Sequence, residues 1–257
     1  MLILPDGVRK KKTLNYVGAG SHSQHSVAGL VLDLEAARAT GNTPNSNIGV
    51  NKGTWYDLSG NNNNFPLTGF SYTTSSGWAS AGAAYYLAMA ANNTNYLTLA
   101  GGTMPYTAPL TYDIWCSCSN ASAAAGFLPN TSEYTEGGFG FTLTSSSFTV
   151  GLFVIGVGYH TEYTVSGTWS TINHFIIRIN NNSTCDLYIN GTQITANHTD
   201  TYTATQSGYK QYYINASPWD SSYGTIAANV YSFRVYNIAL TSAQILQNYR
   251  AGYIWPS

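Results

Sequence analysis

Apolar and polar residues alternate along much of this chain, in short runs that are separated by turn residues. The cleanest alternation lies in residues 110–118, and a period of two is typical of a half-buried strand. Turn signals recur between such runs at a spacing that favours an all-β sandwich or barrel. The other predicted strands are the segments 85–89, 96–99, 139–143, 148–154, 160–165, 173–179, 185–189, 212–215 and 229–236.

The first apolar run, residues 29–35, is predicted to form a strand with one buried face. Its leucines fall on one face and its two carboxylates on the other. The apolar face holds Leu30, Leu32 and Leu34, and the opposite face holds Val31, Asp33 and Glu35. Residues 1–27 show no such alternation, so they are predicted to form an N-terminal arm. Residues 28–257 are then one sandwich domain.

Two local motifs predict how later segments connect. The segments 175–179 and 185–189 read as a hairpin, and the Asn190-Gly191 pair that follows them is a strong signal for a tight turn. Residues 241–244, Thr-Ser-Ala-Gln, match a helix capping box and precede an apolar helical face. The sequence therefore predicts a short helix over 242–250.

The segment 55–64 reads Trp-Tyr-Asp-Leu-Ser-Gly followed by four asparagines. It cannot continue a strand, because Asp, Ser and Asn side chains bond to their own backbone, and Gly and Asn accept positive φ. We expect a tight, oxygen-rich corner at a strand end, with Trp55 and Leu58 packed inward. Three roles fit this corner: a hydrogen-bonded structural turn, a cation site or the rim of a binding face.

Charge is scarce in this chain, since 8% of its residues are charged whereas 14% are aromatic. Globular proteins usually carry about 25% charged residues, so solubility here must rest on hydroxyl and amide groups. A formal net charge of −1 offers no field for a polyanion, which disfavours nucleic-acid binding. The local exception is a basic run that is either a solvated tail or an anchoring patch. It consists of Arg9, Lys10, Lys11 and Lys12.

No stretch reaches the length of about 18 apolar residues that a membrane-spanning helix requires, so membrane insertion is not expected. The basic run follows the apolar residues 1–4 rather than preceding them, which is not the order of a signal peptide. The three cysteines, Cys116, Cys118 and Cys185, are interpreted as small buried hydrophobic residues rather than as a disulfide or a metal site.

Four segments carry a resemblance to a known family: residues 29–36, 53–62, 169–194 and 233–245. The last reads Phe-Arg-Val-Tyr-Asn-Ile-Ala-Leu-Thr-Ser-Ala-Gln-Ile and looks like a closing strand with its short helix. In this order the segments resemble the laminin G-like domains of the concanavalin A-like lectin/glucanase superfamily. The resemblance implies an all-β, two-sheet antiparallel jelly-roll sandwich, here with an N-terminal arm and one short C-terminal helix.

The end of the first strand, Leu-Glu-Ala at 34–36, and the motif at 53–61 resemble the variant found in tailed-phage virion proteins. This resemblance implies a non-enzymatic virion structural protein, either a capsid decoration or a tail appendage. The arm would bind other virion proteins, and the sandwich would contact host-surface polysaccharide. A free carbohydrate-binding module is the alternative, and both hypotheses leave homo-oligomerisation open.

A glycosidase is the third hypothesis, because glycoside hydrolysis usually needs two closely spaced carboxyl groups. Asp33 and Glu35 project to the same side of a strand. The chain lacks the Glu-x-Asp-x-x-Glu pattern of the related glucanases, which favours these two residues as surface carboxylates. We therefore expect no catalytic residues and no enzyme activity.

Calcium is the one cofactor that the resemblance implies, at the loop that follows the first strand. The oxygens there would come from Asp57, Ser59, Asn61 and Asn63. Calcium usually takes more than one carboxylate, and Asp57 is the only charged residue in this loop. Tyr231 and Ser232 stand where the family often has a second acid. The interpretation is therefore a structural corner, with no cofactor expected.

Aromatic side chains in the predicted loops offer a platform for sugars or for contacts between subunits. The candidates are Tyr159, Tyr163, Tyr212, Tyr213, Trp219 and Tyr223.

Overall fold

The structure of the chain is a computed structural model. It describes residues 25–37, 48, 52–82, 84–90, 94–100, 104–105, 107–119, 127–129, 138–154, 158–181, 184–195, 209–210, 212–215 and 227–252.

An eight-stranded antiparallel sheet forms the first layer of the molecule, with the strand order β15-β14-β13-β8-β18-β5-β4 and with β1 also paired to β18. Its strands are β1 (Leu30–Glu35), β4 (Gly77–Ala81), β5 (Ala84–Met89), β8 (Leu110–Cys118), β13 (Asn173–Asn181), β14 (Thr184–Ile189), β15 (Thr192–Ile194) and β18 (Ala228–Tyr236). Two strands share one side of β18, because β5 pairs with its first residues and β1 with its last.

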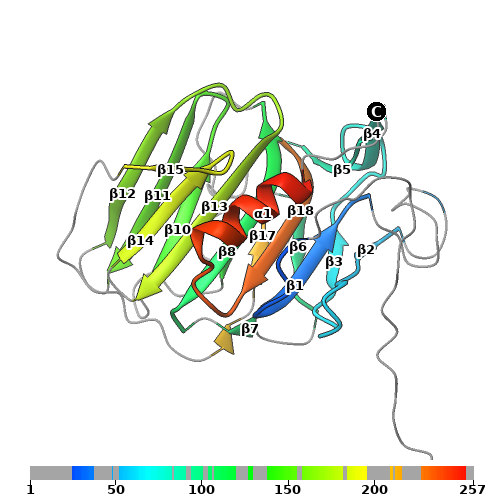
Figure 1. Cartoon of the computed structure of the whole chain (residues 1–257). Helices are drawn as coiled ribbons and strands as arrows, with labels where there is room; N and C mark the ends of the chain where they lie inside the picture. Colours follow the sequence, from blue (N-terminus) through cyan, green and yellow to red (C-terminus); the bar gives the residue numbers. More distant parts are fainter. Residues whose placement is uncertain are drawn as a thin grey trace, which may run out of the picture.

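Two smaller sheets form the opposing layer (Figure 1). A five-stranded sheet contains β2 (Thr54–Trp55), β3 (Phe65–Thr68), β6 (Tyr96–Thr98), β17 (Tyr212–Ile214) and β9 (Phe127–Pro129). A three-stranded sheet contains β10 (Gly138–Leu143), β11 (Ser147–Val154) and β12 (Gly158–Ser166). A two-stranded ladder joins β7 (Met104–Pro105) to β16 (Tyr209–Lys210). The predicted jelly-roll sandwich is thus confirmed.

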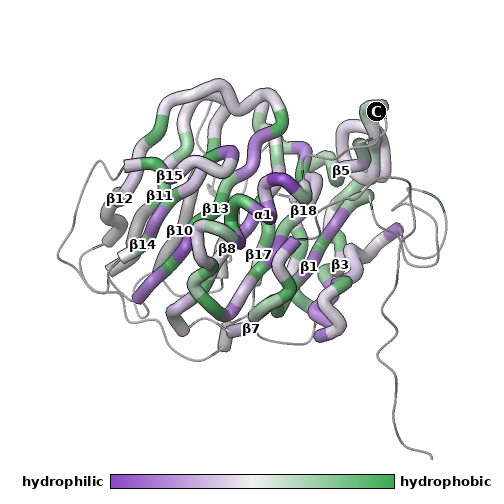
Figure 2. Tube along the Cα trace, in the orientation of Figure 1, coloured by the Kyte–Doolittle hydropathy of each residue, from purple (hydrophilic) through white to green (hydrophobic). Residues whose placement is uncertain are grey.

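The main hydrophobic core fills the space between the two layers. Alternate residues of β8, such as Tyr112 and Ile114, face this core, which also contains Phe148 and Ile214 of the opposing layer. The intervening residues of β8 face the other way, and Figure 2 shows hydrophilic positions interspersed with hydrophobic ones along the strands of the large sheet. Asp113 and the other outward residues of β8 are also buried, so another part of the chain must cover this outer face of the sheet.

The helix α1 (Ser242–Gly252) is part of that cover, since it crosses the outer face over β13, β8 and β18 (Figure 1). A second apolar cluster lies beneath it, formed by Ile176, Tyr188, Tyr236, Leu240 and Ile245. The predicted capping box is confirmed, because the Gln244 backbone N–H donates to the Thr241 Oγ1 and the Thr241 N–H donates to the Gln244 Oε1. The large sheet is therefore covered on both faces where α1 lies.

The predicted hairpin and its turn are also confirmed. β13 pairs with β14, and β14 pairs with β15 across Asn190 and Gly191, which have φ values of 51° and 77°. Two consecutive positive φ values are typical of the type I′ turn that Asn-Gly favours.

The first strand departs from its predicted alternation. The register of β1 against β18 shifts between Leu30 and Leu32, as in a β-bulge. Leu32 and Leu34 lie in the main core, but Val31 packs against that core as well, and Leu30 packs against the cluster beneath α1. The prediction that Leu30 shares a face with Leu32 is wrong, because a bulge adds one residue and reverses the faces before it.

Candidate functional site

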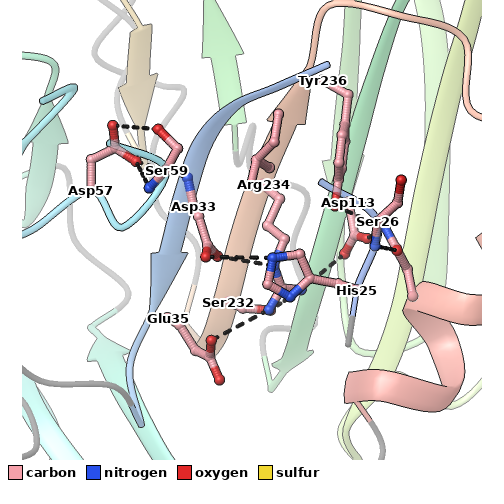
Figure 3. Close-up of polar contacts among 12 residues, drawn as sticks. His25, Ser26, Asp33, Glu35, Asp57, Ser59, Asp113, Ser232, Arg234 and Tyr236 are labelled. Atoms are coloured by element: carbon pink, nitrogen blue, oxygen red, sulfur yellow. Dashed lines mark hydrogen bonds and ion pairs between the residues drawn. The ribbon is translucent and has the colours of Figure 1, made fainter. Parts of the chain in front are cut away.

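The candidate carboxylates Asp33 and Glu35 lie on the outer face of β1, beside Arg234 of β18. The Arg234 Nε donates to the Asp33 Oδ1 at 2.9 Å, and its Nη2 lies 3.6 Å from the Glu35 Oε2. Figure 3 shows the guanidinium between these carboxylates and Asp113 of β8. The Asp33 side chain is only 2% exposed, so the expectation of a solvated surface carboxylate is wrong for this residue.

Asp113 continues the same cluster toward the centre of the sheet. Its Oδ1 lies 3.1 Å from the His174 Nε2 and 3.7 Å from the Arg234 Nη1. The Asn248 Nδ2, on α1, donates to the Asp113 Oδ2 at 2.7 Å. We call this set, Asp33, Glu35, Asp113, His174, Arg234 and Asn248, the Arg234 network.

The charges of the Arg234 network stabilise one another. Burial by itself raises the pKa of Asp113, but His174, Arg234 and the Asn248 hydrogen bond lower it from 3.8 to about 2. Burial likewise lowers the pKa of Arg234, but the charges of Asp33, Asp113 and Glu35 raise it above its ordinary value. Asp113 is therefore an anion and Arg234 a cation at neutral pH, in a site that α1 covers.

His174 is enclosed by aromatic rings as well as by the carboxylate of Asp113. Its ring stacks on Trp115, with centroids 4.6 Å apart, and on Tyr249 of α1, with centroids 5.8 Å apart. The side chain is 1% exposed, so it is held in place from three sides. This packing fixes the network to α1 and leaves His174 no access to a substrate.

The last residues of the predicted arm pack on this network. The Ser26 N–H donates to the Asn248 Oδ1 at 2.7 Å, and the Gln244 Nε2 donates to the Ser26 Oγ at 3.2 Å. The His25 Nε2 lies 3.6 Å from the Asp33 Oδ2. His25 and Ser26 thus contact the sandwich. The basic run of Arg9, Lys10, Lys11 and Lys12 lies outside the described residues.

The corner at 55–64 is organised by the carboxylate of Asp57. Its Oδ1 accepts hydrogen bonds from the backbone N–H groups of Asp33 and Ser59, at 3.0 and 2.9 Å. Its Oδ2 accepts from the Ser59 Oγ at 2.8 Å and from the Asn63 N–H at 2.9 Å. The predicted hydrogen-bonded corner is confirmed, and it fastens the loop to β1. Trp55 is fully buried as predicted, whereas Leu58 is half-buried.

This arrangement does not fit a calcium site. Asn61 and Asn63 turn their Nδ2 groups to the Val31 carbonyl, at 3.2 and 2.8 Å, so these amides act as donors. Both Asp57 oxygens are occupied by N–H and O–H donors. Within the described part of the chain, no three His, Cys, Asp or Glu side chains are grouped so that they could hold a metal.

Two of the aromatic candidates for a glycan platform are buried. Tyr163 is 4% exposed and Tyr212 is 1% exposed, so neither presents a stacking surface and this expectation is corrected. Their strands are covered on the core side, where the Tyr212 and Tyr112 hydroxyls lie 3.0 Å apart. Tyr213 is partly exposed on β17. The side chain of Tyr159, and Trp219 and Tyr223 altogether, lie outside the described residues.

The cysteines behave as small apolar side chains. Cys116 and Cys118 are buried in the core, and burial raises the pKa of the Cys116 thiol. Free thiols are found at all three cysteine positions. Among the described residues, no helix has the length and apolarity to cross a membrane.

Comparisons with known proteins place this geometry in a family. A family model described as the concanavalin A-like lectin/glucanases superfamily matches residues 91–246, more than half of the chain. Comparison with curated protein sequences gives no match. Similar solved structures are mostly binding domains of larger proteins.

Three of these structures illustrate the likeness. The binding domain of Paraclostridial Mosquitocidal Protein 1 has a TM-score of 0.60 and 14% identity, over 86% of this chain and 52% of that one. The botulinum neurotoxin serotype D ligand binding domain in complex with N-acetylneuraminic acid has a TM-score of 0.58 and 12% identity, over 86% and 50%. Domain 4 of AbnA, an extracellular arabinanase from Geobacillus stearothermophilus, in complex with arabinotriose, has a TM-score of 0.59 and 13% identity, over 86% and 98%.

These identities show a shared fold. The chain spans about half the length of the toxin domains that it matches, and almost all of the arabinanase domain.

Proposed function

This chain belongs to the concanavalin A-like lectin/glucanases superfamily, and on that premise we propose that it is a non-enzymatic glycan-binding domain carried by a tailed-phage virion. The neighbouring structures support the binding part, because two of them hold a sugar, arabinotriose in one and N-acetylneuraminic acid in the other. The ligand of this chain would be a polysaccharide of the host surface.

The observation that carries the non-enzymatic part is the contact of Arg234 with both Asp33 and Glu35. A glycosidase needs one carboxyl group that gives up a proton and another that acts as base or nucleophile at the sugar. Here a single guanidinium pairs with both carboxylates, and Asp33 is buried. Both carboxylates are thus held by the same guanidinium, and the buried Asp33 has no access to a sugar.

An assay of polysaccharide hydrolysis tests directly whether the domain is an enzyme. The purified protein is incubated with a panel of bacterial surface polysaccharides, and reducing ends are measured alongside binding. We expect binding without release of reducing ends. Cleavage by the natural sequence that is lost in Glu35→Gln would establish the glycosidase instead. The Glu35→Gln variant suits this test because Glu35 is partly exposed and lies at the edge of the Arg234 network.

The virion part rests on the resemblance of the 34–36 and 53–61 motifs to tailed-phage structural proteins. The strand that ends in the first motif is bonded to the second motif, since the Leu58 N–H donates to the Asp33 carbonyl and the Asp57 Oδ1 accepts from the Asp33 N–H. The arm, with its basic run at 9–12, would bind the capsid or tail.

Removal of residues 1–24 tests the anchoring role while it keeps the contacts of His25 and Ser26 with the sandwich. Particles assembled with the shortened protein should lack it, whereas the free domain should keep its thermal stability and its glycan binding. Full incorporation of the shortened protein would refute anchoring by the arm.

A free carbohydrate-binding module is the second candidate, because this fold covers 98% of an arabinanase domain that is itself one part of a larger enzyme. Mass spectrometry of purified particles separates the two candidates. Glycan binding by a protein that is missing from particles would favour the free module.

A further inference from the structure

The loop between β3 and β4, residues 69–76, holds a tyrosine in an unusual backbone conformation. Tyr72 has φ of 57°, in the left-handed region that bulky side chains rarely adopt. Such a residue persists only where the surrounding structure holds it, and such positions are frequent at binding sites. We call residues 69–76 the Tyr72 loop.

Contacts within the loop and with buried Asn95 hold the Tyr72 loop in place. Thr73 and Ser76 exchange backbone hydrogen bonds of 3.0 and 3.2 Å. The Ser71 N–H donates to the Ser76 Oγ at 3.2 Å, and that hydroxyl donates to the Asn95 Oδ1 at 2.9 Å. The Asn95 Nδ2 donates in turn to the Gly69 carbonyl. The loop is therefore fixed before any ligand arrives, which reduces the entropy lost on binding.

A lysine lies directly against the tyrosine of this loop. The Lys52 Nζ is 4.6 Å from the centroid of the Tyr72 ring, and the Lys52 carbonyl accepts a 2.9 Å hydrogen bond from the Trp78 Nε1. Lys52 is exposed and Tyr72 is partly exposed. In the described part of the chain, no carboxylate forms an ion pair with Lys52, whereas Arg178 and Arg234 are both paired.

Exposed hydroxyl groups flank Tyr72 in the same loop. Ser71, Thr73 and Ser75 are exposed. The Thr73 Oγ1 lies 3.4 Å from the Ser71 Oγ and 3.3 Å from the Ser75 Oγ. One ammonium, one aromatic ring and a row of hydroxyls on a rigid support are the groups that recognise a carboxylated sugar. The ammonium pairs with the carboxylate, the ring packs on C–H groups, and the hydroxyls bond to the hydroxyls of the sugar.

We propose that Lys52 and the Tyr72 loop form a subsite for an acidic sugar, a uronic or sialic acid residue within the bound polysaccharide. This assignment rests on the proposed glycan binding and adds the chemical class of the ligand. It also gives the chain a binding residue, Lys52, that is not a member of the Arg234 network.

Three variants and two ligand classes test the subsite. The variants are Lys52→Gln, Tyr72→Asn and the control Arg250→Gln, which removes the same charge from an exposed position on α1. Asn suits position 72 because it accepts positive φ, so the ring is removed without new backbone strain. Binding is measured by calorimetry with oligogalacturonate and oligosialate, and with neutral arabino- and gluco-oligosaccharides. Circular dichroism verifies that each variant is folded.

The acidic ligands should bind more tightly than the neutral ones. Lys52→Gln should weaken acidic binding by about tenfold or more, as expected for one charge-assisted hydrogen bond, and leave neutral binding unchanged. Tyr72→Asn should weaken both classes, and Arg250→Gln neither.

Two results would count against the subsite in different ways. Acidic binding that is the same in Lys52→Gln as in the natural sequence would overturn the subsite and leave glycan binding intact. Failure of every oligosaccharide and surface polysaccharide to bind would overturn the proposed function itself, and the subsite with it.

Discussion

The Arg234 Nε lies 2.9 Å from the Asp33 Oδ1, although the two residues are 201 positions apart in the sequence. Their side chains are 5% and 2% exposed, so both charges are removed from water. A buried ion pair adds little net stability by itself, but the loss of one partner leaves the other charge uncompensated. Arg234 compensates three carboxylates at once, those of Asp33, Glu35 and Asp113.

Arg234→Met should therefore lower the free energy of unfolding by about 3–5 kcal/mol, because buried carboxylates lose their counter-ion. Urea denaturation of both proteins at pH 7 measures this loss. The matched control is Arg178→Met, whose pair with Asp186 is partly exposed, at 18% and 21%. We expect that control to cost about 1–2 kcal/mol. Equal losses in the two variants would contradict the special role of Arg234.

Acid should destabilise the protein through Asp113. Its pKa is about 2 in the folded protein and 3.8 ordinarily, so the folded state resists protonation of this group. The resulting stability is present above about pH 4 and is lost as the pH falls toward 2, with a size of about 2 kcal/mol. Urea midpoints measured from pH 5 to pH 2 should show this slope, and Asp113→Asn should flatten it. An unchanged slope in the variant would assign the effect to other carboxylates.

Removal of the Asp57 carboxylate should loosen the corner at 55–64. Asp57→Ala deletes the acceptor of four hydrogen bonds, two of which come from backbone N–H groups of the corner itself. We expect a loss of about 2–4 kcal/mol in chemical denaturation. Asn61→Ala, at an exposed position of the same loop, should cost about 1 kcal/mol or less. Asp57→Ala as mild as Asn61→Ala would mean that the corner is held by other contacts.

Calcium should leave the melting temperature unchanged. A site that bound calcium in the folded state would stabilise the protein by mass action, by about 2.7 kcal/mol at a hundredfold excess over Kd. With the Asp57 oxygens bonded to four donors, no such gain is expected in millimolar calcium. Thermal unfolding with calcium and with a chelator provides the comparison, and magnesium serves as the control. A rise that is specific to calcium would restore the metal site.

Gly69 should not tolerate a side chain, whereas Gly82 should. Both have positive φ, 75° and 61°. A Cβ on Gly69 would lie 2.0 Å from the Thr94 carbonyl oxygen, but a Cβ on Gly82 would meet nothing within 4 Å. Gly82→Ala should cost about 1 kcal/mol from backbone strain alone. Gly69→Ala should cost about 3 kcal/mol or more, and it should also weaken binding at the Tyr72 loop. Similar melting temperatures for the two variants would contradict this difference.

The sequence pattern predicts the long strands well because their alternation is local. β8 has the predicted limits, Leu110–Cys118, and α1 begins at the predicted capping box. The pattern does not predict short strands such as β3 and β4. Phe-Pro-Leu-Thr is only four residues long and contains a proline, and Gly-Trp-Ala-Ser-Ala lacks a clear alternation of apolar and polar residues. These segments become strands through pairing in the folded protein, β3 with β2 and β6 and β4 with β5, so their conformation depends on these partners.

In the candidate site, contacts within one loop could be predicted from the sequence, whereas contacts between distant segments could not. The corner at Asp57 could be predicted, because the residues that bond its carboxylate lie within the same loop, apart from Asp33. The burial of Asp33 could not, because its side chain pairs with Arg234 of β18, 201 positions later in the sequence. Tyr163 and Tyr212 were expected at the surface, but both are buried. Tyrosine occurs at exposed binding surfaces and also in cores where its hydroxyl has a hydrogen-bond partner. Each of these two hydroxyls donates to a backbone carbonyl.

The position of β18 in the large sheet has a consequence for synthesis of the protein. This strand lies between β8 on one side and both β1 and β5 on the other, so three strands made earlier depend on it. While a ribosome is still making the segment before residue 228, those strands lack their shared neighbour and the carboxylates of Asp33 and Asp113 lack Arg234. Closure of the sheet must then bring together residues such as Leu34 and Phe233, and contacts between residues so far apart in the sequence make folding slow. During that interval the unpaired strands are exposed to proteases and to one another.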